Sequence, residues 1–202
     1  MSKPEPVSVP SLKVTPLSLP GLTLLVPKRH GDARGYFSET YNRRTFESAG
    51  LNADFVQDNQ SLSAQAGTLR GLHFQIPPFA QIKLIRVLRG AIWDVCVDIR
   101  HGSPTFGQQV GVTLSAQNGH QLWVPEGFAH GFCTLESDTE VLYKVSQYYA
   151  PDHDKGLAWD DPALGIDWPL QNGVTPVLSD KDQAHPPLSA LPTFFEYSPK
   201  DQ

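Results

Sequence analysis

Residues 68–98 combine side chains that can handle protons and negative charge with the sequence of a buried sheet. Arg70, His73 and Lys83 lie among residues typical of apolar strands in the run TLRGLHFQIPPFAQIKLIRVLRGAIWDVCVD. A second run, residues 121–135 (QLWVPEGFAHGFCTL), places His130 in a similar setting. If the two runs face one another inside a barrel, the chain holds a polar pocket within an apolar wall.

These residue types suit proton transfer next to a carbonyl group. Histidine acts as a base near neutral pH, and lysine or arginine stabilises the oxygen of an enolate. Tyr143 belongs to a later strand-like run, and a tyrosine on the far side of the substrate could return a proton to the opposite face of the same carbon. Two proton-transfer groups that flank one carbon predict an epimerase.

Several other kinds of chemistry lack their motifs. The chain has no G-x-S-x-G elbow, no P-loop and no G-x-G-x-x-G that opens a helix, so serine hydrolysis, ATP use and dinucleotide binding are not supported. Metal-binding barrels carry two close histidines and a carboxylate on successive strands. Here Phe74 and Gln75 follow His73, and the cations Lys83 and Arg86 come next, which repel a metal ion. We therefore expect no metal and no organic cofactor.

Each candidate residue also has an ordinary structural interpretation. A lone histidine in a strand, such as His73, is more often a hydrogen-bonded structural residue than a base. Lys83 and Arg86 could protect a strand edge against aggregation. Tyr143 could belong to the core, and His130 could cap a turn.

Alternation along the strands does not settle these choices. Arg70 and His73 are an odd number of residues apart, so a regular strand would point them to opposite faces. Either Gly71 marks a bulge that redirects one side chain, or Arg70 reaches the pocket from the end of the strand. Lys83 and Arg86 also differ in face, and alternation alone does not say which one faces the pocket.

Composition limits the partners and the compartment. The 202 residues carry a net charge of −5 without a basic run, so nucleic acid and anionic membranes are not expected partners. No apolar stretch approaches the ~20 residues of a spanning helix, and no secretory signal is evident. Cys96 and Cys133 lie in apolar runs without metal-binding or redox spacing, which is typical of buried thiols in a reducing compartment. We expect a cytoplasmic protein.

The elements that must position these residues are short strands. Strand-like runs recur from residue 22 to residue 148, separated by Gly, Pro and Asn turns, which predicts an antiparallel sandwich or barrel. Only residues 43–50 (RRTFESAG) predict a helix, with Gly50 as its stop. We expect an extended arm in residues 1–20, one domain in residues 21–185, and a tail in residues 186–202 that wraps the barrel as loops and short turns.

Eight motifs in order then resemble one known family. GDARGYF, FVQDNQS, TLRGLHFQIPPFAQIKLIRV, WDVCVDIRHGSPTFG, LWVPEGFAHGF, LYKVSQYYAP, WDDPALGIDWP and LSDKD are similar to the dTDP-4-dehydrorhamnose 3,5-epimerase family, from about residue 21 to residue 182. The resemblance implies an all-β, cupin-type antiparallel jelly roll that works as a homodimer without metal. It also implies conversion of dTDP-4-dehydro-6-deoxy-D-glucose to dTDP-4-dehydro-L-rhamnose, a step in dTDP-L-rhamnose biosynthesis.

The resemblance assigns roles position by position. His73 would be the base that removes the protons at C3 and C5, and Asp182 would pair with it and stabilise its charged form. Tyr143 would be the acid on the other face, and Lys83 would steady the enolate oxygen. Tyr149 would stack on the thymine. The other positions that match contacts to the nucleotide, sugar or diphosphate are Arg34, Glu39, Gln57, Asn59, Arg70, His130, Asp154 and Lys181.

Two details of the resemblance affect the site. The family's segment that corresponds to Arg34 and Glu39 crosses to the partner subunit, so a dimer would complete each site. Asp154 stands where the family commonly has glutamate, which shortens the reach of that contact.

Other functions stay open beside the 3,5-epimerase. The same histidine, lysine and tyrosine could serve a relative that inverts only C3 or only C5. A cupin that binds a sugar nucleotide without converting it is a more distant alternative. A metal-dependent cupin oxygenase would need ligands that this sequence lacks.

Overall fold

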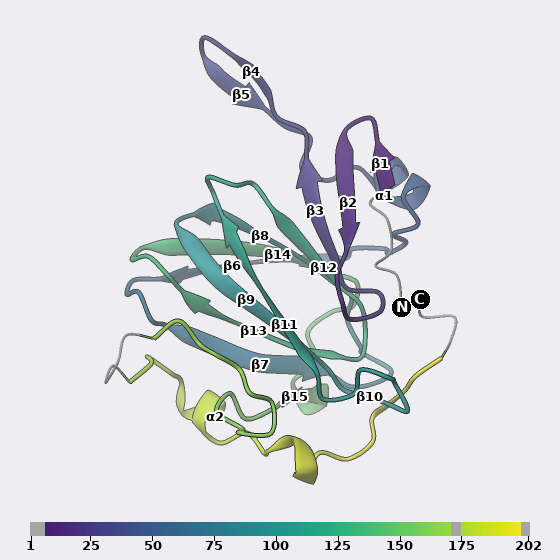
Figure 1. Cartoon of the computed structure of the whole chain (residues 1–202), viewed down its shortest axis with the longest axis vertical. Coiled ribbons are helices and arrows are strands. Elements are labelled where there is room, and N and C mark those ends of the chain that lie inside the picture. Colours follow the sequence, from purple (N-terminus) through teal and green to yellow (C-terminus); the bar gives the residue numbers. More distant parts are fainter. Residues whose placement is uncertain (1–6, 171–174, 199–202) are drawn as a thin grey trace.

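Two antiparallel sheets face one another in the computed structural model, which describes residues 7–170 and 175–198 (Figure 1). The larger sheet has seven strands in the order β1-β2-β3-β12-β8-β14-β6. Their bounds are β1 (Val7–Val9), β2 (Leu12–Pro16), β3 (Thr23–Pro27), β6 (Gln57–Ser63), β8 (Lys83–Arg89), β12 (Gln121–Val124) and β14 (Thr139–Val145).

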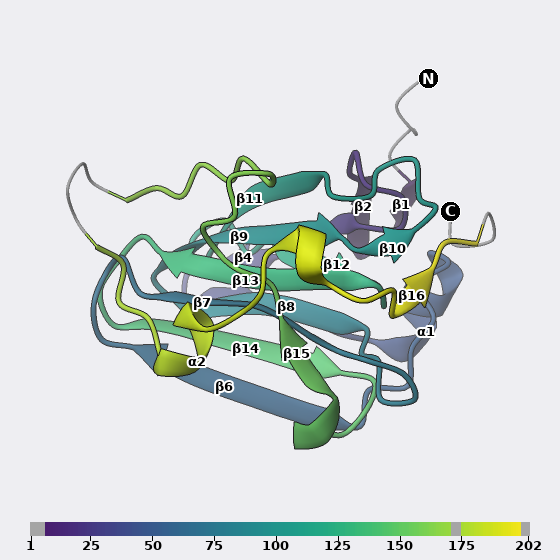
Figure 2. The ribbon, with the colours of Figure 1, turned by 90° about the horizontal axis from the view of Figure 1, so that it is seen from below.

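The smaller sheet has five strands in the order β11-β9-β13-β7-β15 and lies against the first (Figure 2). Neighbouring strands of both sheets come from distant parts of the chain, as where β12 pairs with both β3 and β8. This arrangement confirms the predicted all-β, cupin-type jelly roll. The bounds are β7 (Leu69–Gln75), β9 (Ala91–Asp98), β11 (Gln109–Ser115), β13 (Phe128–Thr134) and β15 (Asp154–Gly156).

A hydrophobic core fills the space between the sheets. Ile85 of β8 and Leu122 of β12 reach it from the larger sheet, and Cys96 of β9 and Phe132 of β13 reach it from the smaller one. Successive side chains of a strand point to opposite faces, so the alternate residues of these strands must find other cover.

The smaller sheet is covered on its outer face as well. Val95 and Val97 of β9 pack there in a second buried cluster with Leu164 and Trp168. The chain after β15 therefore forms a third layer. Cys96 points instead to the core between the sheets, and burial of both faces explains why β9 is apolar almost throughout.

The described part of the expected extended arm, residues 7–20, lies against the rest of the domain. β2 pairs along its whole length with β3, and its alternating residues Leu12 and Val14 share a buried face. Leu19 is buried in the core between the sheets. The segment therefore extends the larger sheet, while residues 1–6 lie outside the described residues.

The predicted tail is also integrated, over residues 186–198. A 3₁₀ turn, η2 (Leu188–Ala190), is followed by β16 (Phe195–Glu196), which pairs in parallel with β10 (Arg100–His101). Leu188 and Phe194 pack against the outer cluster. The expected wrapping by loops and short turns is found here, but the tail shares the core of the domain.

The predicted helix is present, and a second one was missed. α1 (Arg43–Ser48) begins at Asn42, whose side chain accepts a hydrogen bond from the Arg44 amide at 3.0 Å, and the chain leaves it through Gly50 at φ +80°. α2 (Asp180–Gln183) begins at Ser179, whose hydroxyl oxygen accepts from the Asp182 amide at 3.2 Å. A 3₁₀ turn, η1 (Pro151–His153), precedes β15.

A two-stranded hairpin projects from the body of the molecule (Figure 1). It consists of β4 (His30–Asp32) and β5 (Gly35–Phe37), and its aromatic residues Tyr36 and Phe37 are 61% and 72% exposed. Large apolar side chains at the end of a projecting hairpin are typical of a segment that packs on a partner. Within the described residues, no helix is long and apolar enough to span a membrane.

Candidate active site

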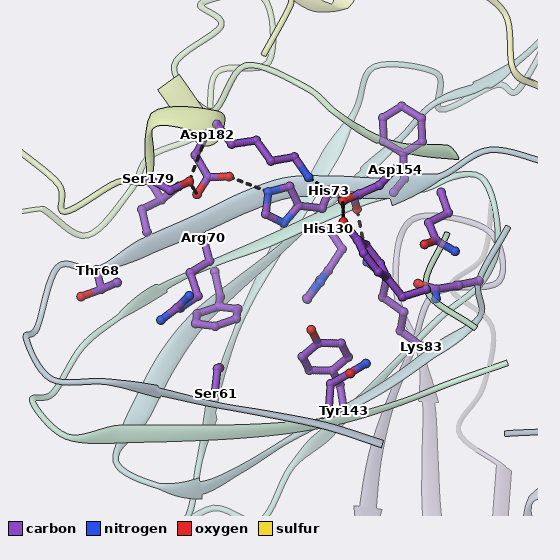
Figure 3. A pocket seen from close by; sticks show the side chains of 18 of the residues that line it. Ser61, Thr68, Arg70, His73, Lys83, His130, Tyr143, Asp154, Ser179 and Asp182 are labelled. Atoms are coloured by element: carbon purple, nitrogen blue, oxygen red, sulfur yellow. Dashed lines mark hydrogen bonds and ion pairs between the residues drawn. The ribbon is translucent and has the colours of Figure 1, made fainter. Parts of the chain in front are cut away.

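A cavity of about 450 Å³ is lined by strands of both sheets and by the segment around α2. Figure 3 shows the side chains gathered around this space. The predicted site residues that line it are Gln57, Asn59, Arg70, His73, Lys83, His130, Tyr143, Tyr149, Asp154, Lys181 and Asp182.

Asp182 binds the imidazole of His73 across the cavity wall. The distance from His73 Nε2 to Asp182 Oδ1 is 2.5 Å, and the Ser179 hydroxyl donates to the other carboxylate oxygen at 2.8 Å. Burial alone would raise the pKa of Asp182, but these hydrogen bonds and the neighbouring imidazoles outweigh burial and lower it. The carboxylate therefore stays charged and holds His73 in one orientation.

A bulge in β7 brings Arg70 and His73 to the same cavity. His130 of β13 pairs with His73, and Phe132 pairs with Arg70, so two steps along β13 oppose three along β7. The extra residue lies at Gly71, where φ is +109° and an added Cβ would lie 2.7 Å from the carbonyl oxygen of His130. The bulge considered from the sequence is therefore the correct alternative.

Lys83 enters the cavity from the first residue of β8. Its ammonium group donates to the backbone carbonyl of His73 at 3.3 Å, and the residue is only 8% exposed. Burial lowers the pKa of Lys83, and the nearby carboxylates Asp94 and Asp154 offset part of this effect. The alternative of a solvated edge cation does not apply to Lys83. Arg86 lies outside this cavity's lining.

His130 forms a second histidine–aspartate pair. Its Nε2 lies 2.9 Å and 3.0 Å from the two carboxylate oxygens of Asp94, which is fully buried in β9. His130 belongs to the middle of β13, so it does not cap a turn. Asp94 was not among the predicted site residues. The sequence feature that could have identified Asp94 is a charged residue inside an apolar strand, because a buried charge requires a partner.

Tyr143 lies in β14, on the other side of the cavity from His73. Its hydroxyl points into the cavity in Figure 3, and the residue is half-buried against the core. Burial raises the pKa of this phenol, so it holds its proton at neutral pH. Asn59 of β6 pairs with Tyr143 in the sheet and accepts from the amide of Gln57 at 2.8 Å.

The mouth of the cavity carries a cluster of polar and charged side chains. The hydroxyl of Tyr149 donates to Asp154 Oδ2 at 3.1 Å, and the ammonium of Lys181 lies 2.5 Å from the same oxygen. Gln57 accepts from the Tyr149 amide at 3.2 Å, which fixes the loop that carries this ring. Tyr149 is 57% exposed, so one face of the ring is open to a ligand.

Arg34 and Glu39 are not brought to the cavity. Arg34 lies at the turn of the projecting hairpin, exposed and paired with Asp32 at 2.5 Å. Glu39 follows the hairpin and is also exposed. Neither residue lines this cavity within the single chain.

Sequence reasoning missed further residues that support the site. Ser179 holds Asp182, and the S-x-x-D spacing of residues 179–182 is a helix-capping pattern that predicts α2. Gln75 is buried and donates to the carbonyl oxygens of Phe79 at 2.8 Å and Tyr148 at 3.1 Å. No sequence pattern comparable to this capping pattern identifies the buried side chain of Gln75.

Comparison with known proteins agrees with this geometry. The family model described as dTDP-4-dehydrorhamnose 3,5-epimerase matches residues 16–190. A curated protein of that name from Sinorhizobium fredii is 55% identical over 181 residues, covering 90% of this chain and 92% of its own length.

Two solved structures extend the comparison. An epimerase from Legionella pneumophila in complex with dTDP-4-keto-L-rhamnose is 43% identical with a TM-score of 0.87, covering 93% of this chain and 99% of its own. A 3'-monoepimerase from Streptomyces bikiniensis in complex with dTDP-quinovose is 36% identical with a TM-score of 0.80, covering 86% of this chain and 87% of its own. By the matches of sequence and structure, the chain belongs to the dTDP-4-dehydrorhamnose 3,5-epimerase family.

Proposed function

We propose that this protein epimerises C3 and C5 of dTDP-4-dehydro-6-deoxy-D-glucose and so forms dTDP-4-dehydro-L-rhamnose, in dTDP-L-rhamnose biosynthesis. The observation that carries the proposal is a histidine–aspartate pair and a protonated tyrosine on opposite sides of one cavity, His73 with Asp182 and Tyr143. A base and an acid on opposite faces of a carbon are what inversion next to a ketone requires.

His73 removes the proton from each carbon. Its Nε2 is bonded to Asp182, so the free ring nitrogen, Nδ1, accepts the proton. The ring then becomes an imidazolium, and the charged carboxylate of Asp182 stabilises it. The 4-keto group takes up the electron pair as an enolate.

Lys83 and His130 line the cavity beside the His73–Asp182 pair. The ammonium of Lys83 reaches the backbone of His73, beside the base, and His130 is held by Asp94 on the neighbouring strand. A buried cation stabilises developing negative charge more strongly than an exposed one, because water does not screen it. We assign Lys83 to the enolate oxygen and His130 to a sugar oxygen.

Tyr143 returns a proton to the face opposite His73. Burial keeps its phenol protonated, which an acid requires before the transfer. After epimerisation at one carbon, the sugar must turn to present the second carbon to the same pair. The order of the two inversions follows from how the sugar is held, not from a second set of residues.

The remaining residues hold the nucleotide. The guanidinium of Arg70 is directed by bonds to Ser63 and the carbonyl of Leu62, both at 3.2 Å, and suits the diphosphate. The open face of Tyr149 suits the thymine ring. The other contacts to sugar, base or phosphate are assigned to Gln57, Asn59, Asp154 and Lys181.

A homodimer completes each site in this proposal. The exposed hairpin, with Tyr36 and Phe37 as apolar anchors, inserts into a second copy and carries Arg34 and Glu39 to the partner's cavity. We place the reaction in the cytoplasm, where buried free thiols such as Cys96 and Cys133 persist.

Solvent deuterium tests the proposal. Incubation with dTDP-4-dehydro-6-deoxy-D-glucose in heavy water places deuterium at both C3 and C5 if the protein is a 3,5-epimerase, as nuclear magnetic resonance of the sugar shows. Deuterium at one carbon identifies a mono-epimerase, and deuterium at neither identifies a binding protein. Either of these results would overturn the proposal.

A further inference from the structure

His185 lies beside the His73–Asp182 pair and has no part in the mechanism above. Its ring packs edge-on against the ring of His73, with 5.5 Å between centroids and 81° between planes. Its Nε2 lies 3.8 Å from Asp182 Oδ1, the oxygen that also binds His73. One nitrogen of each histidine and one carboxylate oxygen lie within 4.8 Å of one another.

The Nε2 atom of His185 is a buried polar atom whose hydrogen-bonding capacity is unsatisfied. The side chain is only 9% exposed, and this nitrogen has no hydrogen-bond partner among the described residues. A buried polar atom without a partner costs free energy, and it is an uncommon feature unless a ligand satisfies it.

A glycine creates the space for this ring. Gly156 of β15 lies opposite His73 in the sheet, and a Cβ at this position would collide with the imidazole of His185. The backbone of β15 thus lets a second histidine approach the pair. The imidazole of His185 is packed against the backbone of β15 and does not itself line the cavity.

We propose that His73, Asp182 and His185 bind a zinc ion, and that the bound ion inhibits epimerisation. Two imidazole nitrogens and a carboxylate oxygen are a ligand set that zinc prefers, at roughly 2.0–2.2 Å from the metal. Two ligands of a tetrahedral ion are then about 3.4 Å apart. The 3.8 Å between His185 and Asp182 fits this spacing. The 2.5 Å contact between His73 and Asp182 opens by about 1 Å when an ion replaces the shared proton.

The charges around the three ligands permit a cation. Lys181 is paired with the carboxylate of Asp154 at 2.5 Å, which offsets part of its charge near His185. Arg70 is turned toward Ser63 of β6, and the ammonium of Lys83 lies on the far side of His73, at its backbone carbonyl.

Inhibition follows from the atom that the metal occupies. A zinc ion on Nε2 takes over the negative charge of Asp182 and adds its own positive charge to the His73 ring. The neutral imidazole then carries its proton on Nδ1, which has no free lone pair, so His73 cannot take a proton from the substrate. This effect rests on the proposed role of His73, whereas metal binding does not. The ion is an inhibitor here and not a cofactor.

Zinc binding is measured directly on the metal-free full-length protein, by competition with a chromogenic zinc chelator. His185→Phe keeps an aromatic ring and removes the ligand, and His101→Phe removes an exposed histidine of β10, 64% exposed, as the matched control. We expect His185→Phe to bind zinc at least about 100-fold more weakly than wild type, because even the loss of an outer-shell partner costs roughly 10- to 100-fold. His101→Phe should bind as the wild type does.

Activity gives the second readout. Zinc should inhibit the wild type and His101→Phe, a chelator should restore them, and His185→Phe should keep near wild-type activity and resist zinc. Circular dichroism checks the fold of His185→Phe, and His185→Asn replaces it if the ring does not fit. Equal zinc affinity in wild type and both His185 variants would overturn the site, as would binding that leaves activity unchanged in a protein shown to be an epimerase. Zinc binding that depends on His185 in a protein without epimerase activity supports the site and counts against the proposed function.

Discussion

Two histidines of the cavity, His73 and His130, are each bonded to an aspartate and differ in how much of the side chain is exposed. His130 is held by Asp94 with its side chain 9% exposed, and His73 is held by Asp182 with its side chain 32% exposed. A base must contact the carbon that it deprotonates, so the more open ring is the better candidate. His130 is the more rigid of the two and suits a fixed hydrogen bond to the sugar. Their different exposure, not their residue type, separates the roles.

Replacing His73 with alanine should abolish exchange of the C3 and C5 protons. The loss should be about 10²- to 10⁴-fold or more, the usual contribution of a general base. Deuterium incorporation measured by nuclear magnetic resonance checks this, with circular dichroism to confirm the fold. Near-normal exchange in His73→Ala would sink the assignment of the base.

Replacing Tyr143 with phenylalanine should separate abstraction from product formation. The change removes only a hydroxyl, and His73 still takes the proton, so exchange should survive better than formation of the epimerised sugar. Both rates can be followed in one heavy-water experiment. Equal loss of exchange and product formation would contradict separate roles for the two residues.

At the scale of elements, the fold was more predictable than the details that aim its side chains. Short alternating strands with turn residues between them predicted an antiparallel sandwich or barrel, because a strand buried on one face shows period two in its sequence. The bulge at Gly71 was one of two possibilities, since a glycine in a strand has several uses. α2 was missed because four residues are too few for a helical period. The segment of β2 was missed because prolines and serines around it obscure two apolar residues, Leu12 and Val14.

The role of the bulge in β7 can be tested by adding one methyl group at Gly71. Gly71→Ala forces a side chain at φ +109° and places Cβ 2.7 Å from a backbone oxygen of β13, so the two strands must move apart. We expect a loss of stability above the ~1–3 kcal/mol of backbone strain alone, and a fall in turnover because Arg70 and His73 lose their common direction. Denaturant unfolding and steady-state kinetics measure the two effects.

Gly102→Ala is the matched control for that change. Gly102 also has a positive φ, +80°, but nothing lies within 4 Å of its added Cβ. Gly102→Ala should lower the free energy of unfolding through backbone strain and leave turnover unchanged. Similar turnover in the two variants would mean that the bulge does not aim the site.

At the scale of the whole molecule, a buried ion pair joins the sheets to the N-terminal segment. Asp98 binds Arg100 in a paired contact at 2.9 Å and 2.8 Å and also accepts from Ser103 and Thr105, both at 2.7 Å. Arg100 in turn donates to the carbonyl of Pro20 at 3.0 Å. Removing one partner of such a pair leaves a buried charge unmatched, which costs about 3–5 kcal/mol.

The same pair makes stability depend on pH. Burial alone would raise the pKa of Asp98, but its hydrogen bonds outweigh burial and lower the pKa below the ordinary value of 3.8. A carboxyl whose pKa is lower in the folded than in the unfolded state stabilises the fold fully above the unfolded value. That contribution is lost as the pH falls through the folded value. The difference in unfolding free energy between wild type and Asp98→Asn should therefore shrink from pH 7 to pH 3, and a constant difference would contradict this account.

The proposed homodimer makes each cavity depend on two chains, and mixing two inactive variants tests this. Arg34→Ala removes the residue that the hairpin carries to the partner, and His73→Ala removes the base of the chain's own cavity. In a heterodimer of the two variants, one cavity has the intact His73 of one chain and the intact Arg34 of the other. The second cavity lacks both.

Random exchange of subunits makes about half of the dimers heterodimers, and each has one working cavity of two, so roughly one quarter of wild-type activity should return. Size-exclusion chromatography establishes the dimer, and unfolding and refolding the variants together allows the exchange. If every cavity were complete within its own chain, the mixture would show only the average of the two variants. The exposure of Tyr36 and Phe37, which the dimer would explain, would then need another explanation.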